Sequence, residues 1–212
     1  MTIPKLHYIS EGNTPEEHLE NIQNACTSGV ELVQLCLKQT SEKTILKIAK
    51  AARDITAHFQ TRFIINTHYK VAKTVKADGV HLERSDTSAT IARIHLYTWQ
   101  MIGGTANSLQ DCETLLAEEV DYINLGPFRS VKKENAPTLG IHGYSAIMEA
   151  LNTATPIIGF GGIKTEDVKS ILATGISGIG VSEEITKSFD CIKTFNQLLS
   201  ASSTDELRHT FE

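Results

Sequence analysis

The strongest constraint in this sequence is the regular alternation of short apolar runs with helical stretches. The pattern recurs about every 25 positions along the 212 residues and makes eight strand–helix units. Parallel strands joined by helices build a buried sheet, and eight such units close into a barrel. The sequence therefore predicts the α/β class and one eightfold parallel β/α (TIM) barrel domain over residues 1–212. An open, doubly wound sheet is the structural alternative.

The expected elements follow from apolar runs and helix caps. Strands are predicted at residues 5–10, 30–37, 63–66, 79–82, 99–103, 122–125, 156–159 and 178–181. Thr14 is predicted to cap one helix, because a hydroxyl there accepts a first-turn N–H group, and Thr40 and Ser41 precede the next helical stretch. The polar tail from Ala201 onward is predicted to be a last helical turn or two.

A glycine pair, Gly161-Gly162, follows the seventh predicted strand and precedes a helical stretch. Glycine lets a backbone approach a ligand closely, and N–H groups at such turns bind anions. In β/α barrels, the loops after the last two strands frequently form a phosphate site. The glycines also argue against the open sheet, because a dinucleotide fold needs them after its first strand. We therefore expect phosphate binding here, with an ordinary tight turn as the alternative.

Composition excludes several classes of function. A net charge of −5 with dispersed Lys and Arg argues against a nucleic-acid partner, and no apolar run is long enough to span a membrane. The N-terminus lacks the apolar core of a signal peptide. The four cysteines are far apart, which indicates neither a zinc site nor a disulfide framework. We therefore expect a cytoplasmic protein with reduced thiols, and homo-oligomer formation stays open.

Five motifs carry a family resemblance across nearly the whole chain: Val33–Lys38, Ile65–Thr67, Ala77–Leu82, Asp121–Pro127 and Gly161–Ile163. With these motifs the chain resembles the thiamine-phosphate synthase and thiazole tautomerase superfamily. The resemblance implies a reaction between two small molecules, a hydroxymethylpyrimidine pyrophosphate and a thiazole phosphate, with release of pyrophosphate. It also implies assistance by Mg²⁺.

The resemblance assigns Gln34, Lys38 and Asn66 to catalysis and Asp86 to Mg²⁺ binding. Several family positions differ in this chain, and Glu83 and Arg84 stand where the family has a glycine and a glutamine. Cys36 stands where the family has an arginine, and Thr67 stands where it has the other Mg²⁺-binding aspartate. Because cysteine is no fixed cation and threonine carries no charge, both changes weaken the expected pyrophosphate site.

The resemblance assigns further residues to substrate binding: Thr105, Ser130, Lys132, Gly161, Gly162 and Ser182. Lys133 is an alternative to Lys132, because the loop after Pro127 is shorter than in the family. A separate hypothesis gives Arg84 to substrate binding, where its charge returns part of what Cys36 removes.

Some of these residues have ordinary structural explanations. Asp86 is equally well read as an N-cap, because Asp-Thr-Ser precedes a helical stretch. Lys38 has a solvated charge as its alternative. His81 alternates with apolar neighbours and is predicted to be a hydrogen-bonded core histidine. Cys36 is predicted to be a small buried hydrophobe rather than a nucleophile.

Two other functions compete with the synthase. A thiazole tautomerase-like isomerase would need neither the missing arginine nor the missing aspartate, but Pro127 occupies the position where those enzymes carry a histidine. The other is a non-catalytic barrel that binds thiazole or thiamine phosphate. Such a protein would retain the phosphate-binding glycine turn while its pyrophosphate site is weakened.

Overall fold

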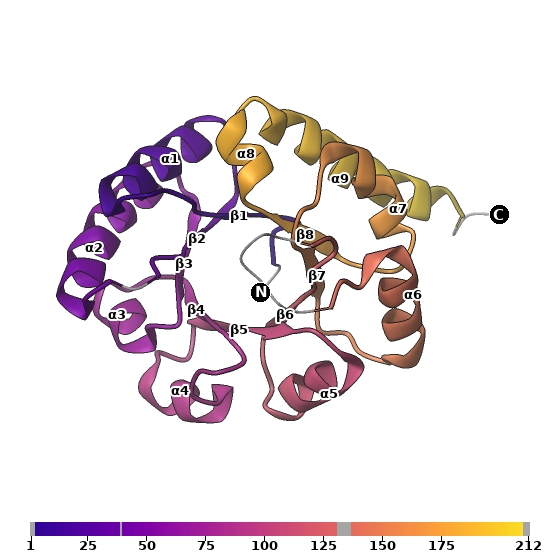
Figure 1. The fold of residues 1–212 in the computed structure, drawn as a ribbon, viewed down its shortest axis with the longest axis horizontal. Coiled ribbons are helices and arrows are strands. Elements are labelled where there is room, and N and C mark those ends of the chain that lie inside the picture. The colour runs from indigo at the N-terminus through magenta and orange to yellow at the C-terminus, as the bar shows by residue number, and fades with distance from the viewer. Residues whose placement is uncertain (1–2, 39, 131–136, 210–212) are drawn as a thin grey trace.

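The computed structural model describes residues 3–38, 40–130 and 137–209. Eight parallel strands follow one another in sequence order around a closed barrel, in which β1 pairs with both β2 and β8 (Figure 1). The strands are β1 (Leu6–Ile9), β2 (Leu32–Leu35), β3 (Arg62–Asn66), β4 (Gly79–Leu82), β5 (Met101–Ala106), β6 (Tyr122–Leu125), β7 (Ile157–Phe160) and β8 (Gly178–Val181). The predicted α/β barrel is confirmed.

Helices surround the strands as an outer ring (Figure 1). They are α1 (Pro15–Thr27), α2 (Glu42–His58), α3 (Tyr69–Thr74), α4 (Ala89–His95), α5 (Leu109–Ala117), α6 (Gly140–Ala150), η1 (Thr165–Asp167), α7 (Val168–Leu172), α8 (Glu183–Lys187) and α9 (Cys191–His209). The Thr14 hydroxyl caps α1 as predicted, and the Ser41 hydroxyl caps α2. Within the described ranges, no helix combines the length and the apolar character that a membrane span requires.

Apolar side chains predominate at the end of the barrel from which the strands start, where His7 is also buried against Tyr122, and polar side chains lie at the other end. A buried cluster fills the end from which the strands start: Ile3, Leu32, Ile64, Met101, Tyr122 and Ile158. Two residues further along their strands, Gln34, Asn66 and Asn124 are buried polar side chains. Because alternate residues of a strand share a face, these polar groups lie above the apolar layer, toward the carboxyl ends of the strands.

Gly103 makes room for Tyr122, one of the largest fully buried side chains. A Cβ atom at Gly103 would lie 2.1 Å from Cζ of Tyr122, inside any permitted contact. The Tyr122 ring is fully buried and stacks on His81 at a centroid distance of 5.6 Å. Gly103 lies in the middle of β5, where only a residue without a side chain leaves room for this ring. Because β5 continues to Ala106, the predicted end of this strand at residue 103 is wrong.

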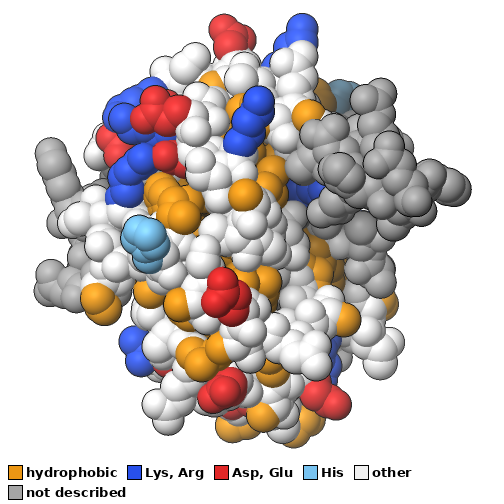
Figure 2. Space-filling model, turned by 90° about the vertical axis from the view of Figure 1, so that its right-hand side faces the viewer, with side chains coloured by type: hydrophobic (Ala, Val, Ile, Leu, Met, Phe, Trp, Pro, Cys, Tyr) orange, Lys and Arg blue, Asp and Glu red, His pale blue; other side chains and the backbone are white. Residues whose placement is uncertain are grey.

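The side of the barrel that carries α6 and α7 has a mixed surface. Figure 2 shows acidic and basic side chains interspersed with apolar ones among the described residues of this face. Nucleic-acid binding requires a basic patch or stripe, and the described part of this face offers none.

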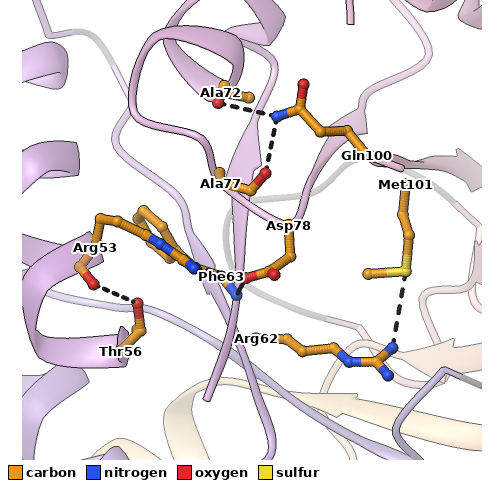
Figure 3. A network of polar contacts seen from close by, with 9 residues as sticks. All are labelled: Arg53, Thr56, Arg62, Phe63, Ala72, Ala77, Asp78, Gln100 and Met101. Carbon is orange, nitrogen blue, oxygen red and sulfur yellow. Dashed lines mark hydrogen bonds and ion pairs between the residues drawn. The ribbon is translucent and has the colours of Figure 1, made fainter. Parts of the chain in front are cut away.

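Gln100 and Asp78 tie the outer helices to the starts of the strands (Figure 3). Gln100 Nε2 donates to the carbonyl oxygens of Ala72 and Ala77, at 3.1 and 2.8 Å, and its Oε1 accepts from the N–H of Tyr97 at 3.0 Å. Asp78 Oδ2 accepts from Arg53 at 2.6 Å. In β/α barrels, residues at the end from which the strands start contribute to stability rather than to catalysis.

Replacing Gln100 by leucine is expected to lower the free energy of unfolding by about 2–3 kcal/mol. Gln100 is 1% exposed, so after the change two carbonyl groups and one N–H group lose their hydrogen-bond partner at a position that water does not reach. Urea unfolding of the variant and the parent measures the effect. Gln110→Leu on the exposed face of α5 is the matched control, and an equal loss there would contradict the explanation.

Candidate active site

The carboxyl ends of β2 to β5 bring four polar side chains together. Gln34 Nε2 donates to Asn66 Oδ1 at 2.7 Å. Asn66 Nδ2 lies 3.3 Å from Glu83 Oε1, and Thr105 Oγ1 lies 3.1 Å from Glu83 Oε2. Gln34, Asn66 and Thr105 are all buried. The structure thus joins three residues that the resemblance assigned and adds Glu83 between them.

His81 extends this series of hydrogen-bonded polar side chains into the barrel interior. Its Nε2 lies 2.8 Å from Thr105 Oγ1, and its Nδ1 lies 3.2 Å from the Tyr122 hydroxyl. Burial lowers the pKa of His81 to about 4, and burial also lowers the pKa of His7 to about 3. Both rings are therefore neutral at pH 7. The prediction of a hydrogen-bonded core histidine at His81 is confirmed.

Asp86 closes the turn after β4. Its Oδ2 accepts the backbone N–H of Glu83 at 2.8 Å, while the Ser88 hydroxyl caps α4 by accepting from the N–H of Ile91. The reading of Asp86 as the helix N-cap is therefore wrong, because the helix begins after Ser88. The Asp86 carboxylate is half-buried at the carboxyl end of β4, on the same face of the barrel as Gln34, Asn66 and Thr105.

The donor set at this face suits a weakly held Mg²⁺. The ion takes oxygen ligands and is commonly bound through one or two carboxylates plus substrate phosphates. In the part of the chain that the structure describes, no three His, Cys, Asp or Glu side chains gather as a metal site. Thr67 offers only a hydroxyl, which Asn66 Nδ2 contacts at 3.2 Å. The residues therefore fit a cation held by Asp86 and by phosphate oxygens rather than by the protein alone.

The glycine turn after β7 is built against the chain that follows β6. Gly161 and Gly162 have φ angles of +94° and +66°. The N–H of Phe128 donates to the carbonyl of Phe160 at 2.7 Å, and that of Arg129 to the carbonyl of Gly161 at 3.0 Å. A Cβ atom on Gly161 would lie 2.6 Å from Cβ of Pro127. Glycine is therefore required here by conformation and by close packing.

Arg129 locks the turn in place, and sequence reasoning missed it. Its guanidinium forms a two-bond ion pair with Asp167, at 2.6 and 2.5 Å, and donates to the carbonyl of Gly162 at 3.0 Å. The bonds to Asp167 raise the pKa of Arg129. Of the neighbouring predicted residues, Ser130 is exposed and Lys132 lies outside the described residues.

The remaining predicted residues lie around the rim of the barrel. Arg84 is tied to the start of α5, with NH2 3.2 Å from Asp111 Oδ1 and NH1 3.3 Å from Asn107 Oδ1. Its charge is therefore shared with an acidic partner. Ser182 Oγ lies 3.4 Å from Glu11 Oε2 and links the ends of β8 and β1. Lys38 is exposed beyond the end of β2, and Cys36 is half-buried.

Comparison with known proteins gives a consistent result. A family model described as thiamine monophosphate synthase matches residues 6–185. The thiamine-phosphate synthase of Flavobacterium psychrophilum is 39% identical over 199 residues, covering 92% of this chain and 97% of that protein. The thiamine-phosphate synthase of Bacteroides fragilis is 32% identical over 200 residues, covering 92% and 98%.

Solved structures agree with the sequence relatives. A thiamine phosphate pyrophosphorylase from Pyrococcus furiosus has a TM-score of 0.79 at 25% identity, covering 92% of this chain and 96% of that one. A 3-hexulose-6-phosphate synthase from Salmonella typhimurium has a TM-score of 0.71 at 15% identity, covering 93% and 99%. At that identity, the second likeness concerns the barrel fold alone.

Proposed function

The chain belongs to the thiamine monophosphate synthase family, and we propose that it joins hydroxymethylpyrimidine pyrophosphate to a thiazole phosphate with release of pyrophosphate. It is thus a transferase of thiamine biosynthesis. The observation that carries the proposal is that the buried side chains of Gln34, Asn66 and Thr105 are joined through Glu83 at the carboxyl end of the barrel. This protein has the arrangement with Cys36 and Thr67 in place of the family arginine and aspartate.

The reaction places clear demands on the site. When the bond from the pyrimidine methylene to the pyrophosphate oxygen breaks, that oxygen takes the electron pair and the methylene is left electron-poor. The thiazole nitrogen then supplies its lone pair for the new carbon–nitrogen bond. Cations must stabilise the departing pyrophosphate, while the pyrimidine amino group stabilises the methylene.

We assign the pyrimidine pyrophosphate to the hydrogen-bonded residues Gln34, Asn66 and Thr105 and to the adjoining rim of the barrel. Gln34 Oε1 is buried and has no hydrogen-bond partner among the described residues, so it is an acceptor suited to the pyrimidine amino group. Lys38, exposed at the end of the same strand, supplies a mobile cation to the leaving group. Mg²⁺, held by Asp86 with phosphate oxygens, would supply further positive charge to the pyrophosphate.

We assign the thiazole phosphate to the glycine turn. Gly161 and Gly162 let a phosphate approach the backbone, and Arg129 keeps the turn fixed through Asp167. Ser130 is exposed beside Arg129 and supplies a hydroxyl from the same loop. Both assigned subsites lie at one end of the barrel, as a direct reaction between two substrates requires.

The test is an assay of the purified protein with both substrates and Mg²⁺, with thiamine phosphate followed over time. We expect product that depends on both substrates. A tautomerisation assay and calorimetry with thiazole phosphate accompany it. Isomerisation without product would select the tautomerase, and binding without either reaction would select the non-catalytic barrel; each outcome would overturn the proposal.

A further inference from the structure

We propose that Glu83 is a positioning residue of this site: its carboxylate sets the orientation of the Asn66 and Gln34 amides and of the Thr105 hydroxyl. The role in catalysis rests on the proposed function. The side chain leaves the end of β4 between β3 and β5, where Asn66 contacts one carboxylate oxygen and Thr105 contacts the other. No other described side chain bridges these two residues.

The Thr105 arm has only one consistent direction of hydrogen bonds. The Thr105 hydroxyl donates to the carboxylate oxygen Oε2 of Glu83 across 3.1 Å. Its single proton is then used, and the contact of 2.8 Å with His81 requires a proton on His81 Nε2. Because neutral imidazole carries one N–H, Nδ1 is the acceptor and the Tyr122 hydroxyl donates to it.

The Asn66 arm is ordered in the same way. Two facing amides fix only their relative orientation, because both can flip together and keep one hydrogen bond. Glu83 removes this ambiguity, since its Oε1 accepts only the NH₂ side of Asn66. Asn66 Oδ1 then faces Gln34 Nε2, and the acceptor oxygen of Gln34 is left without a partner among the described residues. Glu83 thereby determines that the site presents an acceptor.

The test compares wild type with Glu83→Ala and Glu83→Gln. Long-range ¹⁵N NMR, with the His81 signal assigned through a His81→Gln variant, reads the ring protonation directly. We expect the Nε2–H tautomer alone in wild type and both tautomers in Glu83→Ala, where Thr105 has lost its acceptor. We expect kcat for thiamine phosphate to fall about ten- to hundredfold in both variants, with the KM for thiazole phosphate within about twofold.

Glu113→Gln, on the exposed face of α5, is the matched control and should change neither readout. A proton on Nδ1 of His81 in wild type would overturn the inference, and so would a Glu83→Ala protein with the wild-type tautomer and kcat. The two proposals fail separately: an inactive wild type would overturn the proposed function, while the NMR result does not depend on turnover.

Discussion

Replacing Asp86 by asparagine is expected to lower kcat/KM for thiamine phosphate formation about 100- to 1000-fold while leaving the melting temperature unchanged. The asparagine side-chain oxygen can still accept the N–H of Glu83, so the turn after β4 is kept. What is lost is the negative charge that would hold Mg²⁺ against the pyrophosphate. Metal assistance is worth several kcal/mol, and each 1.4 kcal/mol is a factor of ten in rate. The coupled assay and thermal unfolding measure the two quantities.

Two controls separate the metal role from the turn. Asp190→Asn, at an exposed position before α9, removes an equal charge far from β4 and should leave the rate unchanged. Titration with Mg²⁺ should show a higher half-saturating concentration in Asp86→Asn than in wild type. If Asp86→Asn keeps the wild-type rate and Mg²⁺ dependence, then Asp86 serves the turn alone.

The barrel could be predicted because each strand–helix unit carries its own local signals. The helix over residues 42–58 and the strands over residues 79–82, 122–125 and 178–181 have the predicted bounds. Ser41 caps its helix, and glycines or acidic residues border the strands. Such signals act within a few residues, so the linear pattern contains them.

The errors occur where a side chain acts at a distance. The fifth strand was predicted at residues 99–103 but runs from Met101 to Ala106. The Gln100 side chain donates hydrogen bonds to the carbonyl oxygens of Ala72 and Ala77, and Gly103 accommodates the ring of Tyr122. Neither contact is visible in a local pattern, because each joins segments about 20 residues apart or more.

The same reason limits prediction of the site. The resemblance assigned Gln34, Asn66 and Thr105, which the structure joins. Glu83 was visible only as a departure from the family pattern, because its contact with Asn66 spans 17 residues. The ion pair of Arg129 with Asp167 spans 38 residues, and the sequence gives no sign that these two side chains meet.

Replacing Gly161 by alanine is expected to destabilise the protein by about 2–5 kcal/mol and to raise the KM for thiazole phosphate at least about tenfold. A φ of +94° costs an alanine about 1–2 kcal/mol. The added Cβ also lies 2.6 Å from Pro127, which forces the loop after β6 or the turn itself to move, at about 1–3 kcal/mol. Displacement of the turn misplaces the bound phosphate. Urea unfolding and steady-state kinetics measure both effects.

Gly175→Ala is the matched control, because Gly175 has nearly the same φ, +92°, without the close approach. The nearest atom to its Cβ is Met148 Cε at 3.5 Å, an ordinary contact. This variant should therefore lose only the conformational part, about 1–2 kcal/mol, and keep the wild-type KM. The difference between the two variants measures what the packing of Pro127 against the turn requires. Equal losses in stability with unchanged KM would mean that Gly161 serves the backbone conformation and not the phosphate.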